Sequence, residues 1–203
     1  MTEKTLIFAT TNQGKAREIR AMMPDWDVLT LDDIGFLGEI EEGGITFEEN
    51  ALIKAETLFG FNEGLPVLAD DSGLCIDYLD GKPGVYSARF LGENTPYYKK
   101  NKYILDLMKD VPEEKRGAHF TCAMVLLAPN GAHRSAIGVL EGRIARRIAG
   151  TGGFGYDPIF FVPESACTTA EMPAYEKNKI SHRAQALQKL KAILESDFLA
   201  QNL

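Results

Sequence analysis

Residues 118–148, AHFTCAMVLLAPNGAHRSAIGVLEGRIARRI, decide the fold class of this 203-residue chain. Two β-rich stretches, 118–128 and 133–148, flank Asn130 and Gly131, and Asn-Gly between two such runs is a strong hairpin signal. A hairpin breaks the strict alternation of strands and helices that is typical of a purely parallel sheet. The sequence therefore predicts an α/β protein with a mixed β-sheet flanked by helices.

Helical signals lie on both sides of this hairpin. Thr46 and Glu49 form a capping box that predicts a helix start, and Thr95 followed by Pro96 is typical of another. Ser181 is the expected cap of the last helix. The predicted helices cover about residues 15–23, 45–61, 96–111 and 181–194.

Apolar runs predict buried strands at residues 5–10 and 159–162. Between them, PVLADDSG (66–73) is expected to be a short strand that runs into an acidic turn, and LCIDYL (74–79) a further strand. At this point the acidic turn fits either an ordinary exposed turn or a metal-binding one.

Composition argues against several classes of function. The chain has 22 Lys and Arg against 29 Asp and Glu, a net charge of −7. Sequence-independent binding of nucleic acid needs a basic surplus, so no nucleic-acid partner is expected. No apolar run reaches the roughly 20 residues of a membrane helix, and no linker is visible, so residues 1–203 are expected to form a single domain without a membrane anchor. Three widely spaced cysteines without metal spacing predict reduced thiols in a cytoplasmic protein.

The stretch TTNQGK (10–15) lies where a predicted strand ends and a helix begins. Such a helix start presents backbone N–H groups and the positive end of the helix dipole, which together suit a phosphate. Lys15 would add a movable positive charge. A capped first turn with a solvated lysine would give the same pattern, so both interpretations stay open here.

Two acidic elements are candidates for a metal site. Glu41 and Glu42 precede a pair of glycines, and Asp70 and Asp71 end a predicted strand beside Ser72. Carboxylate oxygens suit Mg²⁺, which commonly binds one or two carboxylates together with substrate phosphates. Because neighbouring strand residues point to opposite faces, at most one of Asp70 and Asp71 is expected to face a given site.

The segment GTGGFGYDPIFF (150–161) places four glycines in six positions beside Phe154. Glycine in a strand or helix interior is unfavourable, so such a cluster marks a turn or a close approach of the backbone to another group. One interpretation is a tight connection into a buried strand. The other is a floor beneath a flat ligand, with Phe154 stacking on it.

Basic residues gather at the start of the last predicted helix. Lys177, His182 and Arg183 lie around the expected cap, where the helix dipole disfavours cations unless an anion is bound. A solvated basic turn is the alternative. Taken with the phosphate loop, the acids and the glycine segment, this cluster indicates a nucleoside triphosphate with its metal rather than a sugar, a peptide or a membrane.

Six segments carry a resemblance to one enzyme family. In chain order they are ATTNQGKARE (9–18), EEGGITFEENALIKA (41–55), ADDSGL (69–74), PGVYSARF (83–90), GTGGFGYDPIFF (150–161) and KISHRAQAL (179–187). Their sequences and their order are similar to the motifs of the inosine/xanthosine triphosphate pyrophosphatases, and they extend over nearly the whole chain.

This resemblance implies an elongated mixed α/β fold and a homodimer that uses Mg²⁺. The implied reaction is hydrolysis of the deaminated purine nucleotides ITP, dITP and XTP to the monophosphate and pyrophosphate, which keeps them out of DNA and RNA. Glu42 and Asp71 are implied to bind Mg²⁺, and Asp71 also to be the general base. The implied substrate-binding residues are Thr10, Thr11, Asn12, Gln13, Gly14, Lys15, Ser72, Phe154, Gly155, Tyr156, Asp157, Lys177, His182 and Arg183. Lys54 and Arg89 are further candidates.

Two other functions fit parts of this pattern. One is a related pyrophosphatase that acts on modified pyrimidine or other nucleotides. The other is a nucleotide sensor that keeps the pocket without turnover. Both acidic elements are intact, which favours an enzyme over a sensor.

Overall fold

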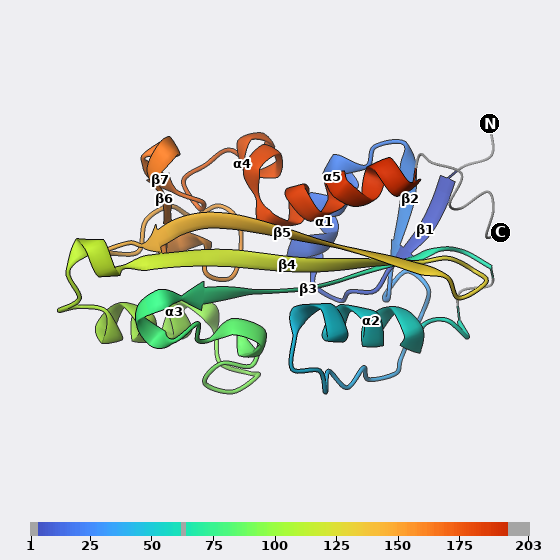
Figure 1. The fold of residues 1–203 in the computed structure, drawn as a ribbon, viewed down its shortest axis with the longest axis horizontal. Coiled ribbons are helices and arrows are strands. Elements are labelled where there is room, and N and C mark those ends of the chain that lie inside the picture. Colours follow the sequence, from blue (N-terminus) through green and yellow to red (C-terminus); the bar gives the residue numbers. More distant parts are fainter. Residues whose placement is uncertain (1–3, 62–63, 195–203) are drawn as a thin grey trace. The chain divides into compact units, whose positions relative to one another are not determined.

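The computed structural model describes residues 4–61 and 64–194 (Figure 1). Its strands are β1 (Lys4–Phe8), β2 (Trp26–Thr30), β3 (Val67–Ile76), β4 (Gly117–Leu127), β5 (His133–Ile144), β6 (Phe160–Val162) and β7 (Cys167–Thr168). Its α-helices are α1 (Gln13–Met22), α2 (Phe47–Thr57), α3 (Tyr97–Leu107), α4 (Ala174–Ile180) and α5 (His182–Leu194). The 3₁₀ turns are η1 (Asp77–Leu79), η2 (Gly84–Tyr86), η3 (Glu113–Lys115), η4 (Asp157–Ile159) and η5 (Pro163–Ser165).

Within the described residues, seven strands form one sheet in the order β2-β1-β3-β4-β5-β6-β7. β1 pairs in parallel with β2 and β3, whereas β6 pairs antiparallel with β5 and β7. The predicted hairpin is present between β4 and β5. Gly131 has a φ of 88°, which favours glycine, and its N–H donates to Ala128 O at 2.9 Å. The mixed α/β architecture is therefore confirmed.

The chain divides into two compact units. Unit 1 comprises the chain up to Asp71, residues Cys122–Gly138 and the chain from Arg183 onward. Unit 2 comprises Ser72–Thr121 and Val139–His182. Strands β3, β4 and β5 each contribute residues to both units. A single domain over the whole chain stays a prediction.

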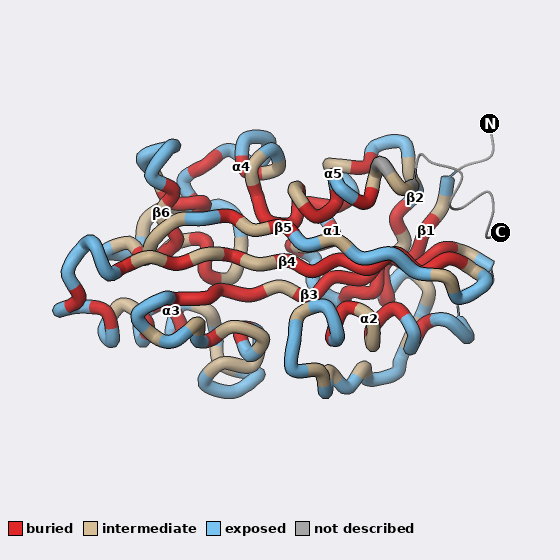
Figure 2. The backbone as a smooth tube through the Cα atoms, viewed as in Figure 1, coloured by how far each residue is buried: buried red, intermediate tan, exposed pale blue. Residues whose placement is uncertain are grey.

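Unit 1 has an apolar layer on each face of its strands. Helices α1 and α5 cover one face and α2 covers the other (Figure 1). Because strand side chains alternate, Phe8 of β1 packs in the first layer, with Ile19 of α1 and Leu187 of α5, whereas Ile7 packs in the second. The parts of β3 and β4 that belong to unit 1 are accordingly buried throughout, whereas the part of β5 in unit 1 is mostly exposed (Figure 2).

Unit 2 has one apolar cluster, in which α3 packs on the strands. Ile104 of α3 and Met108, which follows directly after α3, are fully buried there. Phe120 of β4 and Phe160 of β6 belong to the same cluster, and their ring centroids lie 4.3 Å apart. This cluster is the support on which the glycine-rich segment before β6 rests.

Three local predictions are wrong, and one helix is missing from them. The further strand expected at residues 74–79 is instead the end of β3 followed by the 3₁₀ turn η1. Asp70 and Asp71 lie inside the continuous strand β3 and not in an acidic turn. Thr95 does not cap α3, because its Oγ1 donates to a carbonyl four residues earlier and Pro96 occupies the cap position. The seven-residue helix α4 is absent from the predicted helices, since it is too short to give a periodic apolar signal.

Of two other helix predictions, one is confirmed and one stays a prediction. The capping box is confirmed: Thr46 Oγ1 accepts from Glu49 N at 3.1 Å, and Glu49 Oε2 accepts from Thr46 N at 3.2 Å. Ser181 directly precedes α5 in an extended conformation, and its capping role stays a prediction. Among the described helices, none is both long and apolar enough to span a membrane.

Candidate functional site

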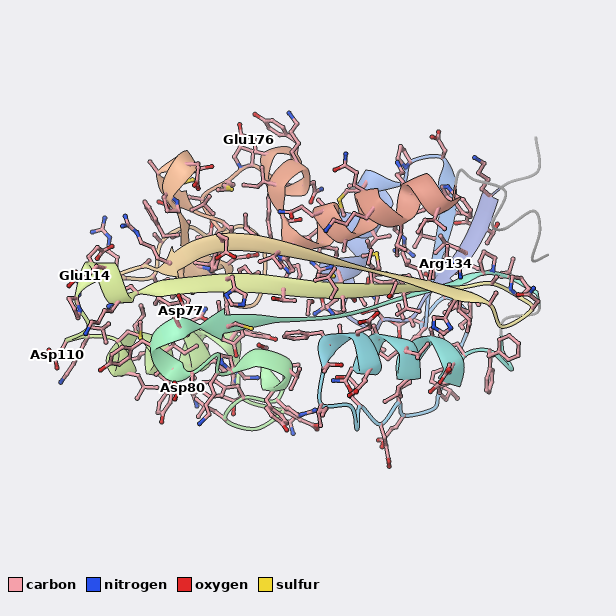
Figure 3. The ribbon with its side chains drawn as sticks, in the orientation of Figure 1. Asp77, Asp80, Asp110, Glu114, Arg134 and Glu176 are labelled. Atoms are coloured by element: carbon pink, nitrogen blue, oxygen red, sulfur yellow. The ribbon has the colours of Figure 1, made fainter. Side chains whose placement is uncertain are left out.

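Asp70 and Asp71 lie in the middle of β3 and are almost fully buried, with 1% and 6% of their surface exposed. Their side chains leave opposite faces of the strand and reach different partners, as strand geometry requires. They differ in this from acidic residues such as Asp110 and Glu114, which project outward from the ribbon (Figure 3). Because Asp70 and Asp71 have different partners, each belongs to a separate cluster of polar side chains.

The Asp71 cluster brings the two acidic elements of unit 1 together. Lys54 Nζ, on α2, lies 2.9 Å from Glu42 Oε1 and 3.8 Å from Asp71 Oδ1. Asn50, one turn earlier on α2, donates from Nδ2 to Asp71 Oδ2 at 3.0 Å. Its Oδ1 accepts from Gly44 N at 2.8 Å. Glu42 and Asp71 therefore share one ammonium group.

Burial and charge act against each other in this cluster. Burial raises the pKa of the Asp71 carboxyl, and the charges of Lys54 and Lys15 oppose the rise without cancelling it. Burial alone would lower the pKa of Lys54, but the charges of Asp70, Asp71 and Glu42 outweigh it and raise that pKa. Lys54 is therefore charged at neutral pH, while Asp71 holds a proton more readily than an exposed aspartate does. A carboxylate with raised proton affinity is suited to act as a base toward water.

On the other face of β3, Asp70 is the centre of a buried ion-pair network. Lys15 Nζ lies 3.0 Å from Asp70 Oδ1, and Arg183 Nη2 lies 3.2 Å from Asp70 Oδ2. Nη1 of the same guanidinium group lies 2.5 Å from Glu18 Oε2. The network joins α1, β3 and α5 within unit 1 and fixes the position of the Lys15 ammonium.

The network keeps Asp70 ionised. Burial would raise the pKa of the Asp70 carboxyl, but the charges of Lys15 and Arg183 outweigh it and hold that pKa well below its ordinary value. Cys122 lies against Asp70, and burial together with that negative charge raises the pKa of its thiol. Asp70 is thus ionised at neutral pH and contacts two cations.

The loop before α1 caps the helix with one of its own side chains. Asn12 Oδ1 accepts from Gly14 N at 2.9 Å and from Lys15 N at 3.2 Å, and Thr10 Oγ1 accepts from Asn12 N at 3.1 Å. Residues 11–13 are exposed. The first turn is therefore capped, as one interpretation expects, but Lys15 is not a solvated lysine, because its ammonium is paired with Asp70.

In unit 2, the glycine-rich segment turns around the carboxylate of Asp157. Asp157 Oδ2 accepts from Phe154 N at 2.8 Å and lies 2.5 Å from Lys177 Nζ, while Oδ1 accepts from Thr169 Oγ1 at 2.8 Å. Lys177 Nζ also lies 4.8 Å from the centroid of the Phe154 ring, a cation–π distance. Gly153 has a φ of 67°, and a Cβ at that position would overlap the Asp157 carboxylate.

The remaining predicted residues of unit 2 differ in exposure. Tyr156 is 4% exposed, and its hydroxyl donates to a backbone carbonyl at 2.8 Å. His182 is buried, and its ring stacks on Phe120 with centroids 4.8 Å apart. Phe154, Gly155 and Ser72 are partly exposed. Of the two aromatic residues predicted to form the platform, Phe154 is thus partly exposed and Tyr156 is buried.

Gly153→Ala should lower the free energy of unfolding by about 3 kcal/mol, because a left-handed φ and a displaced Asp157 carboxylate both add strain. Gly81→Ala is the matched control, since Gly81 has a φ of 77° and an added methyl group there would meet no heavy atom within 4 Å. That control should lose only about 1 kcal/mol. Urea denaturation measures both, and equal losses would show that the Asp157 contact adds nothing.

Three buried polar residues of these clusters are absent from the sequence predictions. They are Glu18, Asn50 and Thr169, with 9%, 0% and 1% of their surface exposed. Asparagine is a poor helix former, so Asn50 next to Ala51 on the apolar face of α2 is a signal that sequence reasoning could have used. Glu18 and Thr169 offer no local signal, because their partners are distant in sequence.

The donor set of the Asp71 cluster fits a hard divalent cation. Glu42 and Asp71 present carboxylate oxygens around one position that is already taken by a cation, the Lys54 ammonium. Mg²⁺ is commonly bound by one or two carboxylates together with phosphate oxygens and water. No group of three or more His, Cys, Asp and Glu side chains in residues 4–61 and 64–194 is placed to hold a metal ion.

The sequence of the chain is similar to those of known proteins. The chain matches the model of the Ham1 family over residues 6–193. A dITP/XTP pyrophosphatase of Bacillus licheniformis is 50% identical over 194 residues, which cover 95% of this chain and 98% of that protein. Another, of Geobacter sulfurreducens, is 50% identical over 188 residues, which cover 92% and 94%.

Solved structures agree with these matches. The structure of the Staphylococcus aureus Ham1 protein superposes with a TM-score of 0.84 at 36% identity, covering 96% of this chain and 100% of that one. A HAM1 protein from Coxiella burnetii superposes with a TM-score of 0.82 at 39% identity, covering 94% and 98%. The sequence and the fold lead to the same assignment: the chain belongs to the Ham1 family.

Proposed function

We propose that this protein hydrolyses the deaminated purine nucleoside triphosphates ITP, dITP and XTP to the monophosphate and pyrophosphate, with Mg²⁺ as cofactor. Relatives named dITP/XTP pyrophosphatase that are 50% identical support this substrate class. The observation that carries the proposal is the approach of Glu42 and Asp71 to one ammonium group, that of Lys54. Two carboxylates that share a cation in this way form an oxygen-ligand pair for a divalent metal.

Glu42 and Asp71 would hold the Mg²⁺ ion. When bound, Mg²⁺ neutralises phosphate charge and favours attack at phosphorus. Lys54 offsets the negative charge of both carboxylates, which lets two acids lie close together in a largely buried environment. The alternative of a nucleotide sensor without turnover is disfavoured by this intact pair.

In the chemical step, Asp71 accepts a proton from a water molecule as the water oxygen bonds to the α-phosphorus. The bond between that phosphorus and the oxygen bridging to the β-phosphate breaks, and pyrophosphate leaves. Lys15 and backbone N–H groups of residues 10–15 would neutralise phosphate charge. Asp70 would keep the Lys15 ammonium in place, since the two groups lie 3.0 Å apart.

The residues proposed for the base lie around α4 and the start of α5. Phe154 would stack on the purine, and Lys177, His182 and Arg183 would complete the surroundings of the base and phosphates. Backbone N–H groups near Ser181 would donate to the 6-oxo group of inosine or xanthosine. The amino group of adenine would leave such donors unpaired, which can discriminate by about 10⁴-fold.

In this scheme Tyr156 and Asp157 act mainly as supports for Phe154. Tyr156 is turned toward the core of unit 2, and the Asp157 carboxylate is used by Phe154 N, Lys177 and Thr169. We also propose a homodimer, from the family resemblance, and a cytoplasmic location, from the three widely spaced cysteines without metal spacing. Sedimentation of the protein at working concentrations tests the dimer, and a monomer mass would contradict it.

Product analysis tests the proposed reaction. Pyrophosphate and orthophosphate release are measured with ITP, XTP, dITP, GTP, ATP and UTP, with and without Mg²⁺. The expected result is pyrophosphate from ITP, XTP and dITP, none without metal, and little turnover of ATP. In isotopically labelled water, the label should appear in the monophosphate. Orthophosphate as the product, label in pyrophosphate, or a preference for UTP would each overturn the assignment.

A further inference from the structure

We propose that Asn50 is a positioning residue that aligns the two acidic elements of the metal site. The inference rests on the proposed function, because it takes Glu42 and Asp71 as the metal-binding pair. Asn50 is fully buried, at 0% exposure, near the start of α2. It lies in unit 1 together with both carboxylates.

The amide of Asn50 uses both of its polar atoms, one toward each acidic element. Its Nδ2 donates to Asp71 Oδ2 at 3.0 Å, on β3. Its Oδ1 accepts from Gly44 N at 2.8 Å, two residues after Glu42 in the loop that leads to α2. One rigid side-chain amide thus connects the strand that carries one carboxylate with the loop that carries the other.

This bridge matters because the Glu42 loop has no regular structure of its own. Residues 36–45 belong to no helix or strand, so their position depends on contacts such as the one at Gly44. Asn50 also distinguishes the two Asp71 oxygens. Oδ2 accepts the amide hydrogen bond, while Oδ1 is the oxygen that approaches Lys54. Loss of a partner that orients a ligating carboxylate typically lowers metal affinity about 10- to 100-fold.

Gly44 shows how closely the loop approaches this amide. A Cβ at Gly44 would lie 2.7 Å from Asn50 Oδ1, 2.8 Å from Glu49 Cβ and 3.0 Å from Asn50 N, closer than side-chain carbons normally come. The neighbouring Gly43 has no heavy atom within 4 Å of the same position. Neither glycine has a positive φ, so alanine strains neither backbone by itself. The two glycines therefore form a matched pair for testing the contact.

The test compares Asn50→Leu, Gly44→Ala and the control Gly43→Ala with the unchanged protein. Leucine has the same branching at Cγ as asparagine, though it is larger, and removes both hydrogen bonds, while alanine at position 44 pushes the loop away from the amide. Mn²⁺ is the probe, and its binding is followed by the loss of the free-ion electron paramagnetic resonance signal. We expect the half-saturating Mn²⁺ concentration to rise about 10-fold or more in Asn50→Leu and Gly44→Ala. It should stay unchanged in Gly43→Ala.

A second measurement separates positioning from general damage to the fold. Pyrophosphate alone, without metal, should bind all variants equally, because Lys15 and residues 10–15 are untouched. If Asn50→Leu does not fold, Gly44→Ala carries the test. Equal Mn²⁺ affinity in Gly44→Ala and Gly43→Ala would overturn the inference. If Glu42→Gln and Asp71→Asn leave Mn²⁺ binding intact, the proposed metal pair itself is wrong, and that result is distinct from the first.

Discussion

Asp71→Asn should reduce pyrophosphate release from ITP by about 10³-fold, the range expected when a general base is removed. The asparagine keeps the shape of the side chain and accepts the Asn50 hydrogen bond, but it neither takes a proton from water nor contributes a charge to Mg²⁺. The loss should appear in kcat at saturating ITP and Mg²⁺. Stopped assays of pyrophosphate release measure it directly.

The same variant should remain folded. Burial raises the pKa of Asp71, so its folded state binds a proton more tightly than the unfolded state does. The stability that this group contributes therefore falls as pH rises from the ordinary aspartate pKa through the raised pKa of the folded state. At neutral pH the charged carboxylate destabilises the folded protein. Asparagine removes that unfavourable contribution, and Lys54 keeps its partner Glu42. The free energy of unfolding should stay within about 1 kcal/mol of the original.

Asp77→Asn is the matched control for this prediction. Asp77 follows the end of β3, is exposed, and pairs only loosely with His119 at 3.9 Å. Its replacement should leave turnover within about 2-fold, since exposed pairs of this kind contribute little. If Asp71→Asn retained turnover at the level of this control, Asp71 would not be the base.

The sequence predicted well wherever the signal is local. The helix start at Thr46 depends on two hydrogen bonds within four residues, and the turn at Gly131 depends on one backbone conformation, so both follow from nearby residues. The mixed sheet follows from the hairpin in the same way. Thr95 shows the limit of such rules, because a carbonyl of the preceding turn competes successfully for its hydroxyl.

The error at Asp70 and Asp71 has a different cause. Aspartate is rare in strands, so the sequence ADDSG by itself favours a turn. In the structure each carboxylate has buried partners, Lys15 and Arg183 for Asp70 and Asn50 with Lys54 for Asp71. Those partners are distant in sequence, and no local rule contains them. Tertiary pairing therefore overrides strand propensity here, at the position where the chemistry is proposed.

Arg183→Met should lower the free energy of unfolding by about 3–5 kcal/mol at pH 7, the largest loss of stability that we predict. Methionine fills much of the volume of arginine but leaves Asp70 and Glu18 without the guanidinium that both contact. Asp70 has no exposed surface on its side chain, so water offers little compensation. Urea denaturation followed by circular dichroism measures the loss.

The pH dependence of this loss identifies its cause. Asp70 has a lowered pKa in the folded protein, so the stability that it contributes is fully present above the ordinary aspartate value, about 3.9, and is lost as pH falls below it. Without Arg183 the pKa of this carboxyl rises, although Lys15 still contacts it, and protonation then relieves the charge that has lost its guanidinium partner. The difference between Arg183→Met and the original protein should therefore be smaller at pH 5 than at pH 7. Arg146→Met, which breaks an exposed pair with Glu113, should lose less than about 1 kcal/mol at either pH. A loss for Arg183→Met that is independent of pH would mean that packing of the arginine stem, and not the ion-pair network, holds α5 against β3.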